Sequence, residues 1–284
     1  MAQLEEKERK LHALLRGYGR VALGFSGGVD SSFLLRASLD ALGPENVLAV
    51  IADTPSLPRK EFAEALRLAE GMGVACLVID PDELSDPSYA ANPADRCYFC
   101  KKHLFELVAQ VAAEKGFACV LDGNNADDAG DYRPGRRAAL ELGVKSPLME
   151  AGLTKAEIRV LSAKAGLPTA DKPAMACLAS RIPYGTPVTA EVLAQVERAE
   201  EAVRGAGFAQ CRVRHHGEVA RVEVPVAGLP ALLENGVREA VVQGVKAAGY
   251  RYVTVDLQGY RTGSLNEGLA GGNGALLKKG TAST

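Results

Sequence analysis

A run of small, hydroxyl-bearing and acidic residues lies near the N-terminus. Its members are Ser26, Gly27, Gly28, Val29, Asp30, Ser31 and Ser32. An apolar run over 21–24 precedes it and a helical pattern over 33–37 follows it. A strand, a glycine turn and a helix start form an anion site, because backbone N–H groups can approach the anion and the helix dipole favours negative charge. The turn lacks the lysine of G-x-x-x-x-G-K-[ST] and the spacing of G-x-G-x-x-G. The sequence therefore predicts a phosphate site of another type, with a serine-rich turn as the alternative.

Acidic and amide side chains follow two other apolar runs. Asp53 ends one run, and Asp122, Gly123, Asn124, Asn125, Ala126, Asp127 and Asp128 end another. Ligands of open parallel sheets bind at the carboxyl ends of the strands, so these residues are expected beside the glycine turn. Carboxylates there can hold Mg²⁺, which takes oxygen ligands and bridges phosphates, and Asp30 is a further candidate ligand. The alternative is a turn rich in Asn and Asp.

Three cysteines lie in polar or irregular surroundings: Cys97 and Cys100 form a C-x-x-C, and Cys177 lies in a proline-rich stretch. A structural zinc site would want a second C-x-x-C or paired histidines, and the sequence offers neither. Three thiolates can bind three irons of a [4Fe–4S] cluster, which leaves one iron open to hold a sulfide. We expect the three side chains to converge; the alternative is that Cys97 and Cys100 are surface thiols.

The other cysteines, Cys76, Cys119 and Cys211, lie in strand-like runs, and we expect them to be buried as small hydrophobic residues. No secretory signal is evident, so the thiols should be mostly reduced and the protein cytoplasmic.

Alternating strand-like and helical runs must position these residues. The strand-like runs are 21–26, 47–53, 75–80, 119–123 and 145–149, and the helical ones are 4–15, 31–42, 59–72, 101–115 and 136–142. The strands are apolar almost throughout, which indicates an α/β fold with a parallel sheet covered by helices on both faces.

The pattern changes after a predicted capping box at Thr154 and Glu157. We predict an ATP-binding-type domain over 1–167, a connector over 168–188 that carries Cys177, a small α+β domain over 189–264 and a disordered tail over 265–284. In the small domain, strands over 211–216 and 219–224 should form a hairpin. Helices near 230–233 and 237–248 and a strand over 250–256 should follow.

Composition excludes some classes of function. The chain has 284 residues, 47% hydrophobic content and a formal net charge of −2. No apolar run reaches the ~18 residues of a membrane span, so no membrane role is expected. Nucleic-acid binders usually carry a basic excess, so a nucleic-acid partner is disfavoured.

Taken together, the motifs resemble those of the PP-loop ATP pyrophosphatases, which split ATP between the α- and β-phosphates. More closely, the chain is similar to the LarE-type sulfur transferases of nickel-pincer nucleotide biosynthesis. The matching segments are 26–32, 92–93, 96–98, 100–101, 122–125, 127–128, 131–135, 177–181, 212–216 and 256–266. The resemblance covers about 4–268 and implies a PP-loop fold, ATP, Mg²⁺ and a homo-oligomer, in that family a hexamer.

The resemblance also implies a reaction. The family adenylylates a carboxylate of a pyridinium dicarboxylate mononucleotide, and a sulfur nucleophile on the cysteine matching Cys177 displaces AMP to leave a thiocarboxylate. In its single-cysteine members that cysteine loses its sulfur and becomes dehydroalanine. The presence of Cys97 and Cys100 makes this chain similar instead to the members with three cysteines and a [4Fe–4S] cluster.

Binding residues follow in the same way. The resemblance assigns Ser26, Gly27, Gly28, Asp30, Ser31, Ser32, Asp53, Gly123 and Asn124 to ATP, and Lys101, Ser180, Arg212, Arg214 and Arg261 to the substrate phosphate. Arginines suit this role because they grip phosphate with two parallel N–H donors. For the pair Arg212 and Arg214, the alternative is a solvated strand face.

Two other classes of function remain open. Another PP-loop enzyme, such as a tRNA thiolase, would also use ATP and three cysteines. A non-catalytic nucleotide-binding module would have no need of the three cysteines together.

Overall fold

A computed structural model of the chain describes residues 2–130, 134–173, 176–261 and 263–265. It divides into two compact units. The first unit comprises Met1–Tyr89 and Asp95–Ala176, and the second comprises Ala90–Ala94 and Cys177–Thr284. The division between Ala176 and Cys177 falls inside the predicted connector, and most of the predicted tail, 266–284, lies outside the described residues.

The first unit is built on a parallel four-stranded sheet of order β3-β2-β1-β4. Its strands are β1 (Val21–Gly24), β2 (Val47–Ala52), β3 (Ala75–Ile79) and β4 (Cys119–Leu121). Its helices are α1 (Ala2–Tyr18), α2 (Val29–Leu42), α3 (Arg59–Gly71), α4 (Pro87–Ala90), α5 (Arg96–Glu114), α6 (Pro134–Glu141), α7 (Pro147–Glu150) and α8 (Lys155–Lys164). The central strands β1 and β2 are buried on both faces, which explains their continuous apolar sequence.

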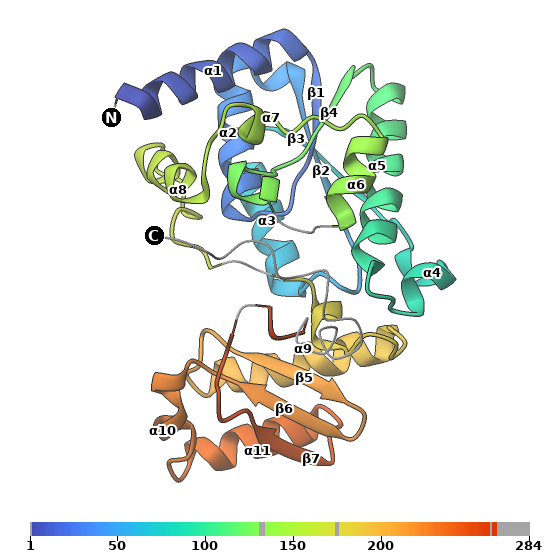
Figure 1. Ribbon diagram of the computed structural model, residues 1–284, viewed down its shortest axis with the longest axis vertical. Coiled ribbons are helices and arrows are strands. Elements are labelled where there is room, and N and C mark those ends of the chain that lie inside the picture. Colours follow the sequence, from blue (N-terminus) through green and yellow to red (C-terminus); the bar gives the residue numbers. More distant parts are fainter. Residues whose placement is uncertain (1, 131–133, 174–175, 262, 266–284) are drawn as a thin grey trace. The chain divides into compact units, whose positions relative to one another are not determined.

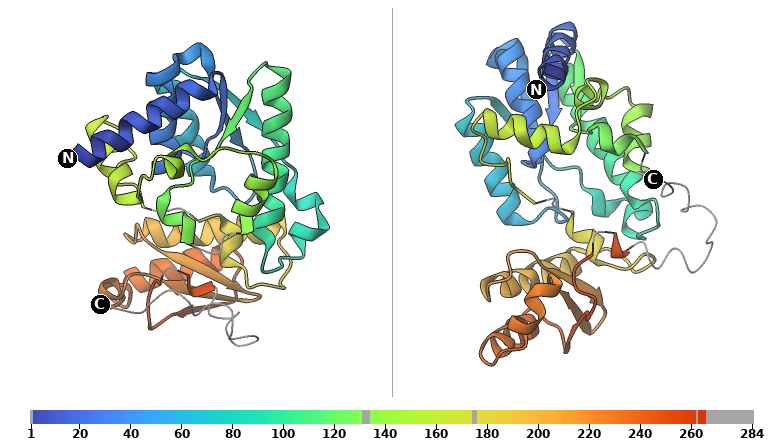
Figure 2. Two further views of the ribbon diagram at one scale, coloured as in Figure 1. Left: turned by 45° about the horizontal axis from the view of Figure 1, so that its top comes forward. Right: turned by 60° about the vertical axis from the view of Figure 1, so that its left-hand side comes forward.

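Helices cover both faces of this sheet (Figure 1 and Figure 2). On one face, Leu23 and Ile51 pack in a core with residues of α1, α2, α3 and α8. On the other face, Ala22 and Val50 pack against Val108 of α5. The predicted α/β class with a doubly covered parallel sheet is therefore confirmed.

Two local predictions for this unit were wrong. The run 145–149 is no strand: a single bridge joins Lys145 to Leu121, and Pro147, which has no N–H for a ladder, begins α7 instead. Cys76 is exposed rather than buried, because β3 is an edge strand of the sheet. Cys119 is half-buried, and Cys211 of the second unit is buried as expected.

The second unit is a small α+β domain. Its sheet has the order β5-β6-β7, where β5 (Arg212–His216) and β6 (Val219–Glu223) form the predicted hairpin and β7 (Tyr252–Val255) pairs parallel to β6. Its helices are α9 (Ala190–Gly205), α10 (Leu229–Leu232) and α11 (Val237–Ala247). Ala199 and Val203 of α9 and Val245 of α11 pack with the buried residues of the sheet. Among the described residues, none of the helices is long and apolar enough to cross a membrane.

Candidate active site

The predicted phosphate turn joins β1 to α2 in the first unit. Gly27 has φ +66°, a left-handed conformation that favours glycine. A Cβ at Gly27 would also lie 2.8 Å from Cβ of Ala65 in α3. Backbone geometry and close packing therefore both require glycine at this position.

The hydroxyl groups of the turn bond to one another and to its backbone. Ser26 Oγ and Ser31 Oγ lie 3.0 Å apart, and Ser31 Oγ donates to the Gly28 carbonyl at 3.2 Å. Gly28 is the N-cap of α2, and it offers no side chain to bond the first N–H groups of the helix. The N-terminus of α2 therefore lies at the turn, where the first N–H groups of the helix and its dipole suit an anion.

Asp30 lies in the first turn of α2, and its carboxylate forms an ion pair with a lysine that the sequence motifs did not identify. Lys155 Nζ, from the start of α8, lies 2.5 Å from Asp30 Oδ2. Asp30 Oδ1 is buried and has no hydrogen-bond partner among the described residues. A buried carboxylate oxygen without a hydrogen-bond partner, next to a predicted phosphate site, is suited to act as a ligand of a cation. Asp30 therefore suits Mg²⁺.

The end of β4 lies directly against the phosphate turn. A Cβ at Gly123 would lie 3.1 Å from the Ser31 backbone nitrogen, so a larger residue there would require the phosphate turn to move by a few tenths of an ångström. The neighbouring Asp122 accepts hydrogen bonds from Ser146 Oγ at 2.7 Å and from Asn124. Burial raises the pKa of Asp122, although the hydrogen bond from Ser146 opposes the shift.

The two other predicted magnesium ligands are engaged in local structure. Asp127 Oδ2 accepts the backbone N–H of Lys155 at 2.9 Å, and Asp128 Oδ2 accepts that of Asn125 at 2.9 Å. Asp127 therefore bonds the first residue of α8, and Asp128 bonds the backbone of its own turn. This arrangement resembles the alternative of an Asp-rich turn, and their magnesium role stays a prediction.

Asp53, at the end of β2, forms an ion pair with Arg59, and Arg59 also donates to the Thr54 carbonyl at 2.5 Å. Arg59 therefore fixes the backbone at the strand end where the adenosine is expected.

A cavity of about 320 Å³ opens beside Gly27. Its lining includes Arg67, Thr169 and Lys172. Lys172 Nζ lies 2.6 Å from Glu61 Oε2 and donates to the Gly27 carbonyl at 3.3 Å. The Thr169 hydroxyl is buried without a hydrogen-bond partner among the described residues. Lys172 therefore ties the phosphate turn to α3, a contact that the motifs did not reveal.

Cys97 and Cys100 lie in the first two turns of α5, which begins at Arg96 and hence earlier than the predicted 101. A spacing of three residues places both thiols on one side of the helix, which suits two ligands of one cluster. Cys100 Sγ donates to Glu83 Oε2 at 3.2 Å. Glu83 is buried and also accepts hydrogen bonds from Ser56 and Tyr89, so it links the segment after β2 to the C-x-x-C.

Lys101 follows Cys100 on α5. Its Nζ lies 5.4 Å from the ring centroid of Phe105, and its charge opposes the upward pKa shift of Asp122. Lys101 is therefore close enough to the end of β4 to act electrostatically there.

Cys177 belongs to the second unit, where its side chain is exposed at the start of a short 3-10 turn, Leu178–Arg181. Arg181 Nη1 donates to the Cys177 carbonyl at 2.9 Å and to Ser180 Oγ at 3.0 Å. The turn that carries Cys177 is thus held by a side chain of its own last residue.

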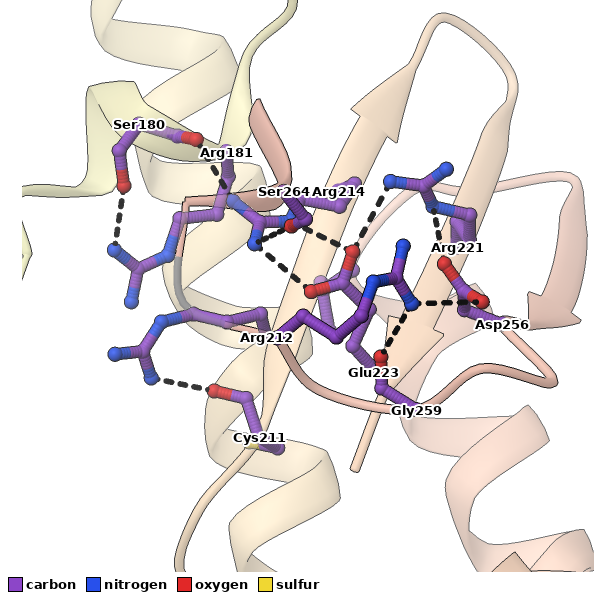
Figure 3. A network of polar contacts seen from close by, with 12 residues as sticks. Ser180, Arg181, Cys211, Arg212, Arg214, Arg221, Glu223, Asp256, Gly259 and Ser264 are labelled. Atoms are coloured by element: carbon purple, nitrogen blue, oxygen red, sulfur yellow. Dashed lines mark hydrogen bonds and ion pairs between the residues drawn. The ribbon is translucent and has the colours of Figure 1, made fainter. Parts of the chain in front are cut away.

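Arg214 lies at the centre of a polar network in the same unit (Figure 3). Two of its nitrogens donate to the Glu223 carboxylate at 3.0 and 2.8 Å. It also donates to the Ser180 carbonyl at 2.9 Å and to Ser264 Oγ at 2.8 Å. Arg214 therefore joins the Cys177 turn to the C-terminal motif.

Arg212 lies two residues before Arg214 on β5, so the two side chains share a face. It donates to the Cys211 carbonyl at 2.7 Å, and its guanidinium lies 5.2 Å from the ring centroid of Tyr260. Burial lowers the pKa of Arg212, and the charge of Arg181 adds to this effect. Arg261 donates to the Gly259 carbonyl at 3.1 Å and lies 3.6 Å from Asp256.

Within each unit, several predicted residues lie together. In the first unit, Asp30, Ser31 and Gly123 surround the phosphate turn. In the second, Ser180 and Arg214 are in contact. The convergence of Cys97 and Cys100 with Cys177 involves both units and stays a prediction. Among the described residues, no group of three His, Cys, Asp or Glu side chains is arranged to hold a metal ion. Residues 131–133, Thr262 and Asn266 of the matching motifs lie outside the described residues.

Comparisons with known proteins bear on this site. A family model for NAD synthase matches residues 7–92, which include the phosphate turn. The pyridinium-3,5-bisthiocarboxylic acid mononucleotide synthase of Lactiplantibacillus plantarum is 40% identical over 269 residues, 95% of this chain and 97% of its own. An uncharacterized protein of Synechocystis sp. is 41% identical over 263 residues, 93% of this chain and 98% of its own. An NH₃-dependent NAD⁺ synthetase of Methanococcoides burtonii is 38% identical over 77 residues, 27% of this chain and 29% of its own.

The NAD synthase match confirms the predicted PP-loop superfamily and with it the use of ATP. The match to the Lactiplantibacillus synthase runs along nearly the whole of both chains. The chain therefore belongs to the LarE-type family of ATP-dependent sulfur transferases.

Proposed function

We propose that this protein converts a carboxylate of a pyridinium dicarboxylate mononucleotide into a thiocarboxylate, at the expense of ATP. The observation that carries the proposal is the 40% identity, along 95% of the chain, to a synthase of pyridinium-3,5-bisthiocarboxylic acid mononucleotide. Because that relative's product is a mononucleotide, a small-molecule substrate is favoured over tRNA. The resemblance of the sequence motifs to LarE-type enzymes also implies a homo-oligomer, and we propose that state for this protein.

The first step is adenylylation in the first unit. A carboxylate is a poor electrophile, and attack of its oxygen on the α-phosphorus of ATP expels pyrophosphate and gives an acyl-adenylate. Ser26, Gly28 and Ser31 line the turn that would hold the departing phosphates through N–H and hydroxyl donors. The ammonium of Lys155 lies at the same place and would offset the charge that develops there.

Magnesium would lower the cost of gathering the phosphates. Asp30 is the ligand that the geometry favours, because Oδ1 is buried and unpartnered among the described residues. When bound, Mg²⁺ would bridge phosphate oxygens and neutralise part of their charge. Asp127 and Asp128 are the further candidates.

Sulfur transfer is the second step, and we propose that Cys177 takes part in it. A sulfur nucleophile attacks the acyl carbon, and AMP leaves with the electron pair of the bond that breaks. If the sulfur is that of Cys177, the Cβ–Sγ bond then breaks with loss of the Cα proton, and dehydroalanine remains. Alternatively, Cys97, Cys100 and Cys177 would be the thiolate ligands of a [4Fe–4S] cluster, and the chemistry that such a cluster would supply is the delivery of sulfide as the nucleophile.

The arginines of β5 and the C-terminal motif are our candidates for the substrate phosphate, together with Lys101 and Ser180. Arg214 is already bonded to Glu223, Ser180 and Ser264, so it fits a role of shaping the site better than that of a sole phosphate ligand. Arg212 and Arg261 also make contacts within the unit, Arg212 to the Cys211 carbonyl and Arg261 to the Gly259 carbonyl and Asp256, and they stay candidates for the phosphate because the guanidinium suits that anion.

The variant Asp30→Ala tests the first step. We expect it to fold and to lose pyrophosphate release from ATP and substrate by ~100-fold or more, because the cation ligand is gone. Asp40→Ala is the matched control: Asp40 lies on the same helix but pairs only with the exposed Arg36 in the contacts described. Wild-type pyrophosphate release by Asp30→Ala would refute the assignment.

A further inference from the structure

Arg181 and Glu200 form a fully buried ion pair in the second unit, with both side chains 0% exposed. Arg181 Nε donates to Glu200 Oε1 at 2.7 Å, and Nη2 donates to Oε2 at 3.0 Å. Arginine is seldom fully buried, and a buried pair contributes little net stability because desolvation offsets the attraction. The pair therefore calls for a role other than stabilisation.

The remaining nitrogen of the guanidinium indicates that role. Arg181 Nη1 donates to the Cys177 carbonyl and to Ser180 Oγ, while the Ser180 N–H donates to the same Cys177 carbonyl at 3.0 Å. One edge of the planar group thus holds the glutamate, and another holds the first residue of the turn. Because the guanidinium is rigid, fixing one edge fixes the other.

Glu200 is itself held from other directions. It accepts hydrogen bonds from Arg204 Nη2 at 2.5 Å and from the Val213 N–H at 3.2 Å. Attraction to arginines, Arg181 before Arg204, lowers the pKa of Glu200 although burial alone would raise it. The carboxylate is therefore a fixed anchor on α9 for the arginine.

We propose that Arg181, oriented by Glu200, is a positioning residue that fixes the backbone of Cys177 so that its exposed thiol is presented for sulfur transfer. The inference rests on the proposed function of Cys177. The Cys177 side chain is exposed, whereas the Cys177 carbonyl accepts a hydrogen bond from Arg181. The sulfur is therefore accessible, and the backbone that carries it is held in place. Group transfer needs this, because a misplacement of about 1 Å costs ~100-fold in rate.

The variant Arg181→Lys separates positioning from general loss of function. Lysine keeps a charge for Glu200 but lacks the planar fork that reaches Glu200 and Cys177 together. In a single turnover, we expect pyrophosphate release to stay within about twofold of wild type and thiocarboxylate formation to fall ~10-fold or more. A merely structural defect would lower both steps together.

Two further variants protect the test. Arg198→Ala is the matched control: Arg198 lies on α9 like Glu200, and the contact described for its side chain is to the Ala248 carbonyl. It should match wild type in both steps. If Arg181→Lys folds poorly, the double variant with Arg181→Gln and Glu200→Gln removes the buried charges together, and the same split between the two steps is expected.

Hydrogen exchange gives a readout that needs no sulfur chemistry. The peptide 177–182 should exchange ~10-fold faster in Arg181→Lys than in wild type or Arg198→Ala, because a charge-assisted hydrogen bond is lost. Equal exchange, or equal thiocarboxylate formation by wild type and Arg181→Lys, would overturn the inference. If wild type releases pyrophosphate but forms no thiocarboxylate, the proposed function fails, and the exchange experiment alone decides whether Arg181 holds the turn.

Discussion

The phosphate turn of the first unit and the arginine network of the second both present groups suited to anions, but they are built differently. The turn uses backbone geometry and residues adjacent in sequence, as in the contacts among Ser26, Gly28 and Ser31. The network uses long side chains from distant segments, and most of their donors are already bonded to protein, as for Arg214.

The arginine network of the second unit also contains carboxylates, whereas the contacts within the phosphate turn are among hydroxyl groups and backbone. Among the described residues of the second unit, six arginines lie with three carboxylates in the contacts that form the network. They are Arg181, Arg204, Arg212, Arg214, Arg221 and Arg261 with Glu200, Glu223 and Asp256. Arginines suit an anionic substrate, but the buried carboxylates of Glu200 and Glu223 hold Arg181 and Arg214 in place through ion pairs. A cluster of arginines therefore does not by itself identify which of them bind ligand.

The largest effect is expected from Glu223→Ala in the second unit. Glu223 is fully buried and accepts hydrogen bonds from Arg214 and Arg221, so its removal leaves buried positive charge unpaired. The free energy of unfolding should fall by ~3–5 kcal/mol. Urea denaturation measures this.

Glu218→Ala is the control for that change. Glu218 lies in the connection of the hairpin to which Glu223 belongs. Its ion pair with Arg251, at 3.6 Å, is exposed, so little change in the free energy of unfolding is expected. Equal stability of the two variants would mean that the network does not depend on its buried carboxylate.

A smaller loss of stability is expected from Gly27→Ala in the first unit. The left-handed φ of +66° and the 2.8 Å approach to Ala65 should together cost ~1–3 kcal/mol. Pyrophosphate release should fall more than stability does, because the turn itself is displaced. Gly17→Ala in α1 meets nothing within 4 Å, so it should leave turnover unchanged and should not lower the melting temperature, because alanine favours a helix more than glycine does. An active Gly27→Ala enzyme would show that the turn tolerates another geometry.

The smallest effect concerns the capping box of α8, beside Lys155. Burial would raise the pKa of Glu157, but hydrogen bonds from Lys7 and Thr154 lower it below 4.5. The charged form therefore stabilises the fold above pH 4.5, and this contribution is lost as the pH falls through the folded-state pKa. Glu157→Gln should cost ~1 kcal/mol at neutral pH. The difference in free energy of unfolding between wild type and Glu157→Gln should become smaller below pH 4.5. A difference that does not change with pH would contradict this explanation.

The same comparison explains what the sequence could predict. The parallel sheet, the phosphate turn, the capping box and the hairpin were predictable because each depends on neighbouring residues or a short period. Lys155 was missed because it lies 125 positions from Asp30. Glu83 was missed because a lone buried carboxylate has no sequence pattern, and its link to Cys100 exists only in the folded unit. Cys76 was misjudged because an apolar strand does not reveal whether it lies at the sheet edge.

The arginines of β5 show which features could not be predicted from the sequence. Their alternation on β5 predicted a shared face, which strand geometry guarantees. The ion-pair partners could not be predicted: Arg214 pairs with Glu223 of β6, and Arg181 pairs with Glu200 of α9. No local spacing connects these glutamates to the Cys177 turn.

The most direct test of the account is a single turnover of anaerobically purified protein with ATP and the pyridinium dicarboxylate mononucleotide, compared with Cys177→Ser. Pyrophosphate is measured enzymatically, and the nucleotide product and the intact protein are measured by mass spectrometry. Wild type and Cys177→Ser should both release pyrophosphate, and only wild type should form the thiocarboxylate. Thiocarboxylate formation by Cys177→Ser would contradict the assignment of sulfur transfer to Cys177.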